Sequence, residues 1–183
     1  MEKHSDVERI LISREQLQKR IIELGKQISK DYEGKKPIVV SILKGSWIFL
    51  ADLVREIDID IECEFMVVSS YGASTSTSGH VTISKDLTVN IENRDIIIVE
   101  DIIDSGTTLD FIKKLFKSRK ANSIEICSLL SKPSRRKIDI DVKYIGFEIP
   151  DLFVIGYGLD FDEKYRSLKD IGILKPEAYN GKI

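Results

Sequence analysis

The chain contains 183 residues, of which 42% are hydrophobic and 32% are charged, and its formal net charge is −2 at pH 7. This balance is typical of a soluble globular protein, and the length favours a single domain, residues 1–183, large enough to bury a core of its own. The small net charge gives no support to a nucleic-acid-binding or membrane-binding surface.

The first predicted element is a helix that begins after Ser13. Ser13 and Gln16 have the spacing of a capping box, in which each side chain accepts a hydrogen bond from the backbone N–H of the other. Hydrophobic residues then recur at the spacing of one helix face, at Leu17, Ile21, Leu24 and Ile28. Gly34 and Pro37 follow and indicate where the helix ends.

Strands and helices alternate along the rest of the chain. Strands are predicted at residues 37–43, 61–68, 96–100, 123–130, 142–146 and 152–155, and two short alternating strands at 81–83 and 87–89. Helices are predicted at residues 47–57 and after residue 108, where Leu109, Ile112, Leu115 and Phe116 share one face. This alternation favours an α/β fold with a mostly parallel sheet flanked by helices.

The N-terminus and the two cysteines indicate where the protein works. The first ten residues are charged and lack the apolar core of a signal peptide, and no apolar run approaches the ~18 residues that a membrane span needs. Cys63 and Cys127 each stand inside an apolar, strand-like run, so we expect two buried free thiols in a reducing compartment. The expected location is therefore the cytoplasm.

The most informative segment joins the strand at 96–100 to the following helix. The strand ends in Glu100 and Asp101, after which come Asp104 and the small, polar residues 105–108. Such a loop at a helix N-terminus offers backbone N–H groups and the positive end of the helix dipole to a phosphate. The carboxylates beside it suit Mg²⁺ or the hydroxyls of a sugar. The segment therefore predicts a site for a phosphorylated sugar.

Polar residues follow two other predicted strands. Lys44 and Gly45 come after the strand at 37–43, and Lys132 comes after the strand at 123–130. Each group also has a purely structural interpretation, in which Asp104 is a helix N-cap and both lysines are solvated charges. In parallel sheets, however, ligands bind beyond the carboxyl ends of the strands, where these segments meet. Their convergence favours a binding site.

These residues also carry a family resemblance. The segment from Ile96 to Asp110 resembles the signature of type I phosphoribosyltransferases that binds PRPP, 5-phosphoribosyl 1-pyrophosphate. Other stretches match the hypoxanthine-guanine phosphoribosyltransferases in order, namely residues 42–46, 69–72, 129–132, 146–151 and 156–166. The resemblance covers nearly the whole chain and implies the type I phosphoribosyltransferase fold, with a small hood formed by the terminal segments. It further implies purine salvage, in which PRPP and a 6-oxopurine are the substrates, and a homodimer or homotetramer.

The resemblance assigns a role to each residue of the predicted site. Asp104 becomes the catalytic group, which takes the proton from purine N7. The residues that bind PRPP are Lys44, Gly45, Glu100, Asp101, Asp104, Ser105, Gly106, Thr107, Thr108 and Arg166, and those that bind the purine are Lys132, Phe153, Val154 and Asp160. The implied cofactor is Mg²⁺, with Glu100, Asp101 and Asp160 as the residues nearest to it.

Several of these implied roles have a clear physical basis. Lys132 would contact purine O6 and so favour keto purines over adenine, and Phe153 would stack on the ring. Arg166 would bind pyrophosphate, which a guanidinium can contact bidentately. The Lys44-Gly45 dipeptide carries a non-proline cis bond in the family, which turns an N–H towards pyrophosphate. Thr107 stands where some relatives have lysine, so the phosphate loop lacks one fixed positive charge.

Residues 69–79 hold five serines and two threonines, a composition too polar and small to pack as a regular element. The resemblance implies that Ser70 and Tyr71 in this segment act as a lid. A lid would exclude water, which could otherwise attack an oxocarbenium-like centre.

Two alternative functions are compatible with the same fold. One is a nucleotide-sensing, RNA-binding regulator without catalysis, which would need a basic face. The small cluster of residues 135–137 is the only local support for it, and we interpret that cluster as a solvated loop. The other alternative is an enzyme that also accepts xanthine, because the sequence does not settle the preference among hypoxanthine, guanine and xanthine.

Overall fold

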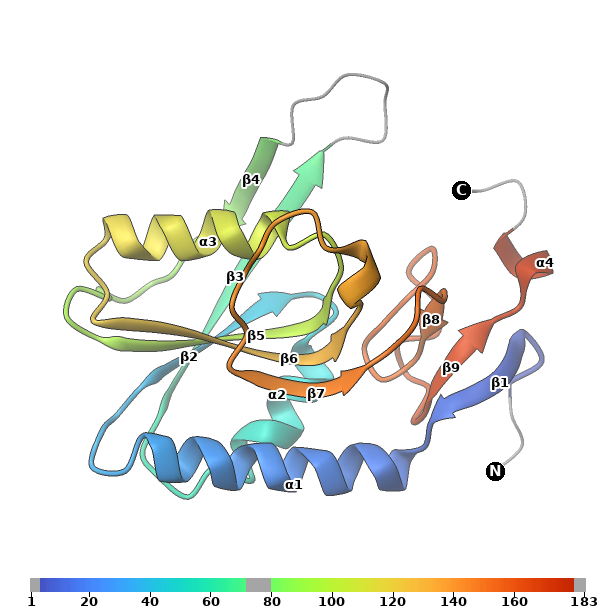
Figure 1. Ribbon diagram of the computed structural model, residues 1–183, viewed down its shortest axis with the longest axis horizontal. Coiled ribbons are helices and arrows are strands. Elements are labelled where there is room, and N and C mark those ends of the chain that lie inside the picture. Colours follow the sequence, from blue (N-terminus) through green and yellow to red (C-terminus); the bar gives the residue numbers. More distant parts are fainter. Residues whose placement is uncertain (1–3, 72–79, 180–183) are drawn as a thin grey trace.

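The computed structural model describes residues 4–71 and 80–179 and contains a central sheet, a smaller hood sheet and helices (Figure 1). The strand order in the central sheet is β4-β3-β2-β5-β6-β7. Its strands are β2 (Ile38–Leu43), β3 (Glu62–Tyr71), β4 (His80–Lys85), β5 (Asp95–Ile103), β6 (Ser123–Ser131) and β7 (Tyr144–Glu148). All neighbouring pairs are parallel except the edge pair of β3 and β4. The predicted α/β fold with a mostly parallel sheet is confirmed.

Helices cover both faces of this sheet. Helices α1 (Arg14–Asp31) and α2 (Trp47–Val54) lie on one face, and α3 (Thr107–Ser118) lies on the other (Figure 1). Val39 and Ile97 therefore pack towards α1 and α2, whereas Val40 and Ile98 pack towards α3. Burial on both faces explains why β2 and β5 are continuous apolar runs.

The hood is a three-stranded antiparallel sheet in the order β1-β9-β8. Strand β1 (Val7–Ile12) comes from the N-terminal part, and β8 (Val154–Ile155) and β9 (Ile171–Leu174) come from the C-terminal part. The short helix α4 (Pro176–Tyr179) follows β9. The hood of terminal segments is thus confirmed, although the strand predicted at residues 152–155 belongs to the hood and is shorter than expected.

Two local predictions about elements hold and three are wrong. The capping box is present, because the Ser13 N–H donates to Gln16 Oε1 over 2.8 Å and the Gln16 N–H donates to Ser13 Oγ over 3.4 Å. The strand predicted at residues 142–146 is present as β7, which begins and ends two residues later than expected. The strand predicted at 87–89 is absent, because Asp86 Oδ1 accepts the Leu87 N–H and turns the chain into a loop. Helix α2 ends three residues before residue 57.

The third wrong prediction concerns the serine-rich segment. Ser69, Ser70 and Tyr71 extend β3 and pair with β4, because an antiparallel ladder needs only backbone groups. Residues 72–79 lie outside the described residues.

Burial differs between the two cysteines. Both thiols are free, and Cys127 is buried in β6 as expected, but Cys63 is exposed. Cys63 and Phe65 alternate onto the same face of β3, and that face is open to solvent here, since Phe65 is exposed as well. The expectation of two buried thiols is therefore wrong for Cys63.

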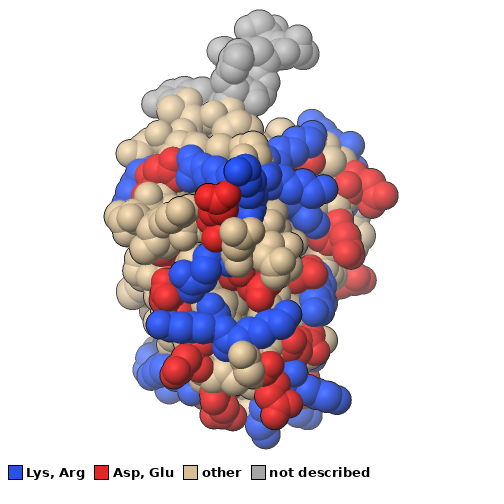
Figure 2. All heavy atoms as spheres, turned by 90° about the vertical axis from the view of Figure 1, so that its left-hand side faces the viewer, with Lys and Arg blue, Asp and Glu red and all other residues tan. Residues whose placement is uncertain are grey.

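Charges of both signs are mixed on the surface. Lys and Arg side chains alternate with Asp and Glu over the face shown in Figure 2. Among the described residues, none of the helices is long and apolar enough to cross a bilayer.

Candidate active site

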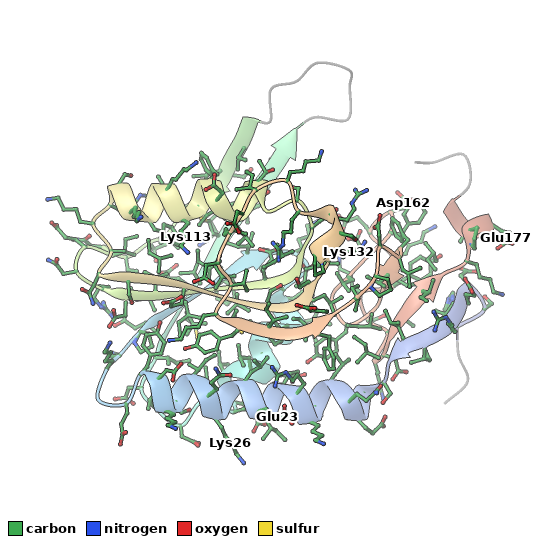
Figure 3. The ribbon with its side chains drawn as sticks, in the orientation of Figure 1. Glu23, Lys26, Lys113, Lys132, Asp162 and Glu177 are labelled. Carbon is green, nitrogen blue, oxygen red and sulfur yellow. The ribbon has the colours of Figure 1, made fainter. Side chains whose placement is uncertain are left out.

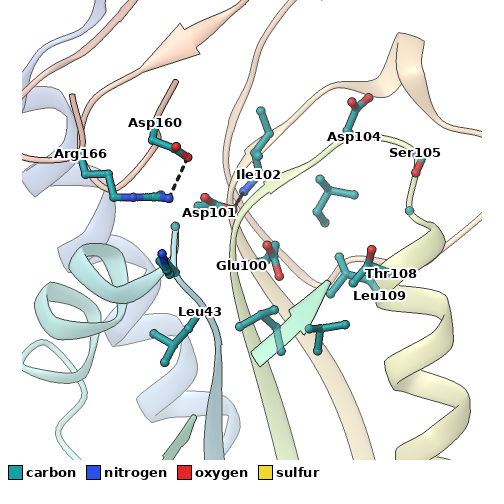
Figure 4. Close-up of a pocket in the computed structure, with 16 residues that line it drawn as sticks. Leu43, Glu100, Asp101, Ile102, Asp104, Ser105, Thr108, Leu109, Asp160 and Arg166 are labelled. Atoms are coloured by element: carbon teal, nitrogen blue, oxygen red, sulfur yellow. Dashed lines mark hydrogen bonds and ion pairs between the residues drawn. The ribbon is translucent and has the colours of Figure 1, made fainter. Parts of the chain in front are cut away.

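The central sheet has a topological switch point between β2 and β5. These strands are parallel neighbours, but the chain continues from β2 to β3 on one side and from β5 to β6 on the other. Open α/β sheets bind their ligands at the carboxyl ends of two such strands. A cavity of about 320 Å³ lies there, lined by the ends of β2 and β5 and by the start of α3 (Figure 4).

The predicted PRPP-binding residues surround this cavity. Arg166 and Asp160 lie on one side of it and Asp104, Ser105 and Thr108 on the other, with the two acidic residues of β5 between them (Figure 4). The predicted residues that line it are Lys44, Gly45, Glu100, Asp101, Asp104, Ser105, Gly106, Thr108, Asp160 and Arg166. Thr107 is not among the lining residues.

A second cavity of about 250 Å³ adjoins the first. It is lined by the predicted purine-binding residues Lys132, Phe153, Val154 and Asp160, together with Asp101, Ile102, Asp104 and Leu159. Both cavities share Asp101, Ile102, Asp104 and Asp160. Asp104 therefore stands where a group bound in one cavity would meet a group bound in the other.

The acidic pair at the end of β5 is deeply buried. Burial, reinforced by the neighbouring Asp101 carboxylate, raises the pKa of Glu100 well above its usual range, and burial also raises the pKa of Asp101. Glu100 Oε2 is buried without a hydrogen-bond partner in the described part of the chain. Buried polar atoms are rarely left unpaired, so this oxygen is available to a ligand hydroxyl or a cation.

Position 45 requires glycine because its backbone lies directly against this acidic pair. A Cβ added at Gly45 would lie 1.6 Å from Asp101 Oδ2, a distance that no real Cβ contact allows. The chain after β2 therefore approaches the acidic pair as closely as a backbone can. The Leu43–Lys44 peptide bond that leads into Gly45 is cis; the resemblance implied a cis bond at the Lys44-Gly45 dipeptide that follows.

The predicted phosphate loop leads directly into α3. Gly106 is the N-cap of α3 and has a φ of +84°, which a residue with a Cβ adopts at a cost. The N-cap interpretation of Asp104 is therefore wrong. Ser105 Oγ donates to Thr107 Oγ1 over 3.1 Å and accepts the Thr107 N–H over 3.4 Å. Thr107 thus orders the loop, although it does not line the cavity.

Arg136 is a residue of this region that the sequence analysis missed. Its Nη2 donates to Ser131 Oγ over 3.1 Å, while its Nη1 is buried without a partner in the described residues. A Cβ added at Gly106 would lie 3.7 Å from that Nη1. The guanidinium therefore brings positive charge close to the phosphate loop, and the interpretation of residues 135–137 as a solvated loop is wrong for Arg136. No local pattern in the sequence marks it.

Beside the second cavity, Lys132 and Arg135 form ion pairs with carboxylates. Lys132 lies at the end of the sheet that faces the hood (Figure 3), with its side chain 12% exposed and its Nζ 3.4 Å from Asp151 Oδ1. Arg135 donates from Nε to Asp104 Oδ1 over 3.0 Å and places Nη1 3.6 Å from Asp151 Oδ2. Asp151 and Arg135 were not predicted as site residues, because their positions beside Asp104 and Lys132 depend on the packing of segments that are distant in the sequence.

The apolar wall of the second cavity comes from the start of the hood. Phe153 precedes β8 and packs edge-on against Phe161, with ring centroids 5.5 Å apart and an interplanar angle of 89°. Val154, within β8, is buried. An aromatic face beside Lys132 and Asp104 suits a flat, polar ring.

Arg166 is held in place from one side of the first cavity. Its Nη1 donates to the Gly158 carbonyl over 2.8 Å, and its Nη2 lies 3.0 Å from Asp160 Oδ1 (Figure 4). Its Nε is buried without a partner in the described residues. Lys44 also lines this cavity and pairs with Glu163 over 3.1 Å. Arg166 and the Lys44-Gly45 dipeptide, which were both predicted to contact pyrophosphate, therefore line one cavity.

Comparisons with known proteins agree with this geometry. The family model for the phosphoribosyl transferase domain matches residues 11–162. This chain belongs to the phosphoribosyltransferase family. The hypoxanthine-guanine phosphoribosyltransferase of Bacillus subtilis is 53% identical to it over 179 residues, which cover 98% of this chain and 99% of that protein.

Solved structures extend the likeness to the whole fold. A hypoxanthine phosphoribosyltransferase from Staphylococcus aureus superposes with a TM-score of 0.93 at 52% identity, covering 96% of each chain. The hypoxanthine phosphoribosyl transferase of Trypanosoma cruzi gives a TM-score of 0.93 at 37% identity, covering 98% of this chain and 97% of that one. The phosphoribosyltransferase fold therefore includes the hood as well as the central sheet.

A metal ion would find few protein ligands in this phosphoribosyltransferase. Within residues 4–71 and 80–179, no group of three or more His, Cys, Asp or Glu side chains could hold an ion by itself. Mg²⁺ is commonly bound by one or two carboxylates together with substrate oxygens. The unpaired Glu100 Oε2 and the adjacent Asp101 fit that kind of site, and Asp160 lines the same cavity.

Proposed function

We propose that this protein is a hypoxanthine-guanine phosphoribosyltransferase of purine salvage. It transfers the 5-phosphoribosyl group of PRPP to hypoxanthine or guanine and releases IMP or GMP together with pyrophosphate. The observation that carries this proposal is the pair of adjoining cavities that share Asp104. One cavity suits a phosphorylated sugar and the other suits a flat base.

The first cavity would hold PRPP by each of its charged parts. The loop at residues 105–108 would receive the 5-phosphate on backbone N–H groups, with the Arg136 guanidinium nearby. Glu100 and Asp101 would accept hydrogen bonds from the ribose hydroxyls. Arg166 and the Lys44 segment would bind pyrophosphate, and positive groups fixed at the leaving group stabilise the charge that develops there.

The second cavity would hold the purine against the sugar. Lys132 would donate to O6, and Phe153 would stack on the ring, with the Val154 backbone at the base edge. The purine nitrogen forms a bond to C1 of the ribose as the bond from C1 to pyrophosphate breaks. Asp104 would take the proton that leaves N7. No covalent intermediate with the enzyme is required.

Mg²⁺ is the proposed cofactor, with Glu100, Asp101 and Asp160 as the residues nearest to it. When bound, Mg²⁺ would neutralise pyrophosphate charge. The buried carboxyls favour this assignment, because burial raises both pKa values and a nearby cation would offset the cost of two adjacent charges.

Ser70 and Tyr71 keep their proposed role as a lid. Their backbone lies at the end of β3, whose neighbour β2 leads into the first cavity. A Tyr71→Ala variant with full kcat/KM for PRPP and hypoxanthine would remove this role.

A turnover assay tests the proposed function. The purified protein is incubated with PRPP and Mg²⁺ and with hypoxanthine, guanine, xanthine or adenine in turn, and nucleotide formation is measured. We expect efficient turnover of hypoxanthine and guanine and very little of adenine, since adenine has no O6 for Lys132. The rate with xanthine decides whether that base is an additional substrate. Absence of turnover with every base would contradict the proposal.

We further propose a homodimer or homotetramer in the cytoplasm, with no nucleic acid and no membrane as partners. In the Trypanosoma cruzi relative, the C-terminal region has a role in the oligomeric state. Two free thiols agree with a reducing compartment. Light scattering on the purified protein measures the number of subunits, and a monomer at all concentrations would exclude an oligomer.

A further inference from the structure

Glu163 occupies a tight turn beside the first cavity. The turn joins Phe161 and Lys164, whose backbones exchange hydrogen bonds of 3.3 and 3.0 Å. Asp162 and Glu163 have φ values of 53° and 60°, the conformation of a two-residue type I′ turn. The Glu163 N–H also donates to Asp160 Oδ2 over 2.9 Å. The backbone therefore fixes where the Glu163 side chain begins.

The Glu163 carboxylate bridges two cations from separate segments. Its Oε1 lies 3.1 Å from Lys44 Nζ, and its Oε2 lies 3.3 Å from Arg166 Nη2. Hydrogen bonds from Lys44 and Arg166 lower the pKa of Glu163, so the bridging group is a carboxylate at neutral pH. Arg166 and the Lys44 segment are the groups that we assign to pyrophosphate, and both side chains line the first cavity. A protein anion thus occupies both of them.

These ion pairs contribute little to folding. The side chains of Lys44 and Glu163 are 66% and 65% exposed, and exposed pairs of this kind add little to stability. The same ion pairs affect ligand binding, because an incoming pyrophosphate group must replace Glu163 at both cations.

We propose that Glu163 is an internal counter-anion of the pyrophosphate subsite, which leaves Lys44 and Arg166 when the pyrophosphate group of PRPP binds. Glu163 thereby weakens the binding of PRPP and of the product pyrophosphate, and it favours release of the product. This inference rests on the proposed function, and it adds a residue that sets the affinity of that site for a diphosphate.

The test compares Glu163→Gln with a matched control. Glutamine keeps the size of the side chain and the turn but removes the charge. The control is Glu92→Gln, which removes the same charge from another exposed pair, with Lys120 at 3.1 Å. Glu92 precedes β5, at the opposite end of that strand from the site. Calorimetry in Mg²⁺ gives the Kd of each variant for PRPP and for inorganic pyrophosphate.

We expect Glu163→Gln to bind both ligands ~3- to 10-fold more tightly than the wild type, as the loss of two ion pairs made by the exposed Glu163 carboxylate would allow. Glu92→Gln should leave both Kd values unchanged. The KM for hypoxanthine should not change in Glu163→Gln, because the purine cavity does not include this residue. In a Lys44→Ala background the gain from Glu163→Gln should shrink, since one of the two released cations is then missing.

Two outcomes would overturn the proposal. Unchanged Kd values would show that Glu163 does not compete with the diphosphate, and weaker binding would show that it positions Arg166 for the ligand. Wild-type turnover with a 6-oxopurine is measured separately, so a failure of the proposed function is distinguishable from a failure of the Glu163 proposal. The calorimetric comparison remains decisive in either case.

Discussion

Replacing Lys132 with alanine should weaken purine binding selectively. The Lys132 side chain is only 12% exposed, and it lies in the wall of the smaller cavity. Its Nζ is 3.4 Å from Asp151 Oδ1 and can exchange that contact for one with a ligand. Loss of a charged donor to a keto oxygen costs ~1.5–3 kcal/mol, which corresponds to an increase of about 10- to 150-fold in the Kd or KM for hypoxanthine and guanine. Discrimination against adenine should fall as well.

The fold should tolerate the Lys132→Ala change. Asp151 keeps the Arg135 guanidinium at 3.6 Å after the lysine is removed, so no carboxylate is left without a cation. Steady-state kinetics with each substrate varied in turn provide the assay. Lys26→Ala is the matched control, because Lys26 is exposed on α1 and points away from the sheet (Figure 3). Equal increases in the KM for PRPP and for purine, or no increase for purine, would refute the assignment of Lys132 to O6.

Three further predictions concern the first cavity. Asp104→Asn should fold, since Gly106 and not Asp104 caps α3, but should lose ~10²–10⁴ in kcat with an unchanged Kd for PRPP; near-normal kcat would remove the general-base role. Gly45→Ala should lower kcat/KM for PRPP by ~10²-fold, because its Cβ would displace the Asp101 carboxylate, and unchanged kinetics would contradict this close approach. Burial raises the pKa of Glu100 well above its usual range, so the folded state binds more protons than the unfolded state between the usual and the raised pKa. The free energy of unfolding should therefore fall as pH rises through that interval. Denaturant titrations at several pH values should show that the free energy of unfolding falls less with pH in Glu100→Gln than in the wild type. The same pH dependence in both proteins would contradict the raised pKa of Glu100.

The sequence alone was sufficient where the signal is local. A capping box needs only the residues between Ser13 and Gln16, and its hydrogen bonds are present in the structure. The acidic pair and the loop that follows it predict a phosphate site, because strand, turn and helix N-terminus are adjacent in the chain. The same kind of local reading failed for Asp104 as an N-cap, since Gly106, with its positive φ, takes that position.

Burial was harder to predict than secondary structure. Cys63 and Arg136 were both misjudged, in opposite directions, because the exposure of a side chain depends on which element covers it. Cys63 lies on a part of β3 that is open to solvent. The Arg136 guanidinium is partly buried beside Gly106, where its Nη2 donates a hydrogen bond to Ser131 Oγ.

The sequence by itself determined most of the helices and strands of the central sheet, the acidic pair, the loop that follows it and the family resemblance, because these are encoded in runs of neighbouring residues. Only the tertiary structure decided the strand order that places the switch point between β2 and β5. It also decided which charges meet: Arg135 reaches Asp104 across 31 residues, and Glu163 reaches Lys44 across 119. Contacts over such separations arise from the packing of the sheet, the hood and their loops, and no local pattern specifies them.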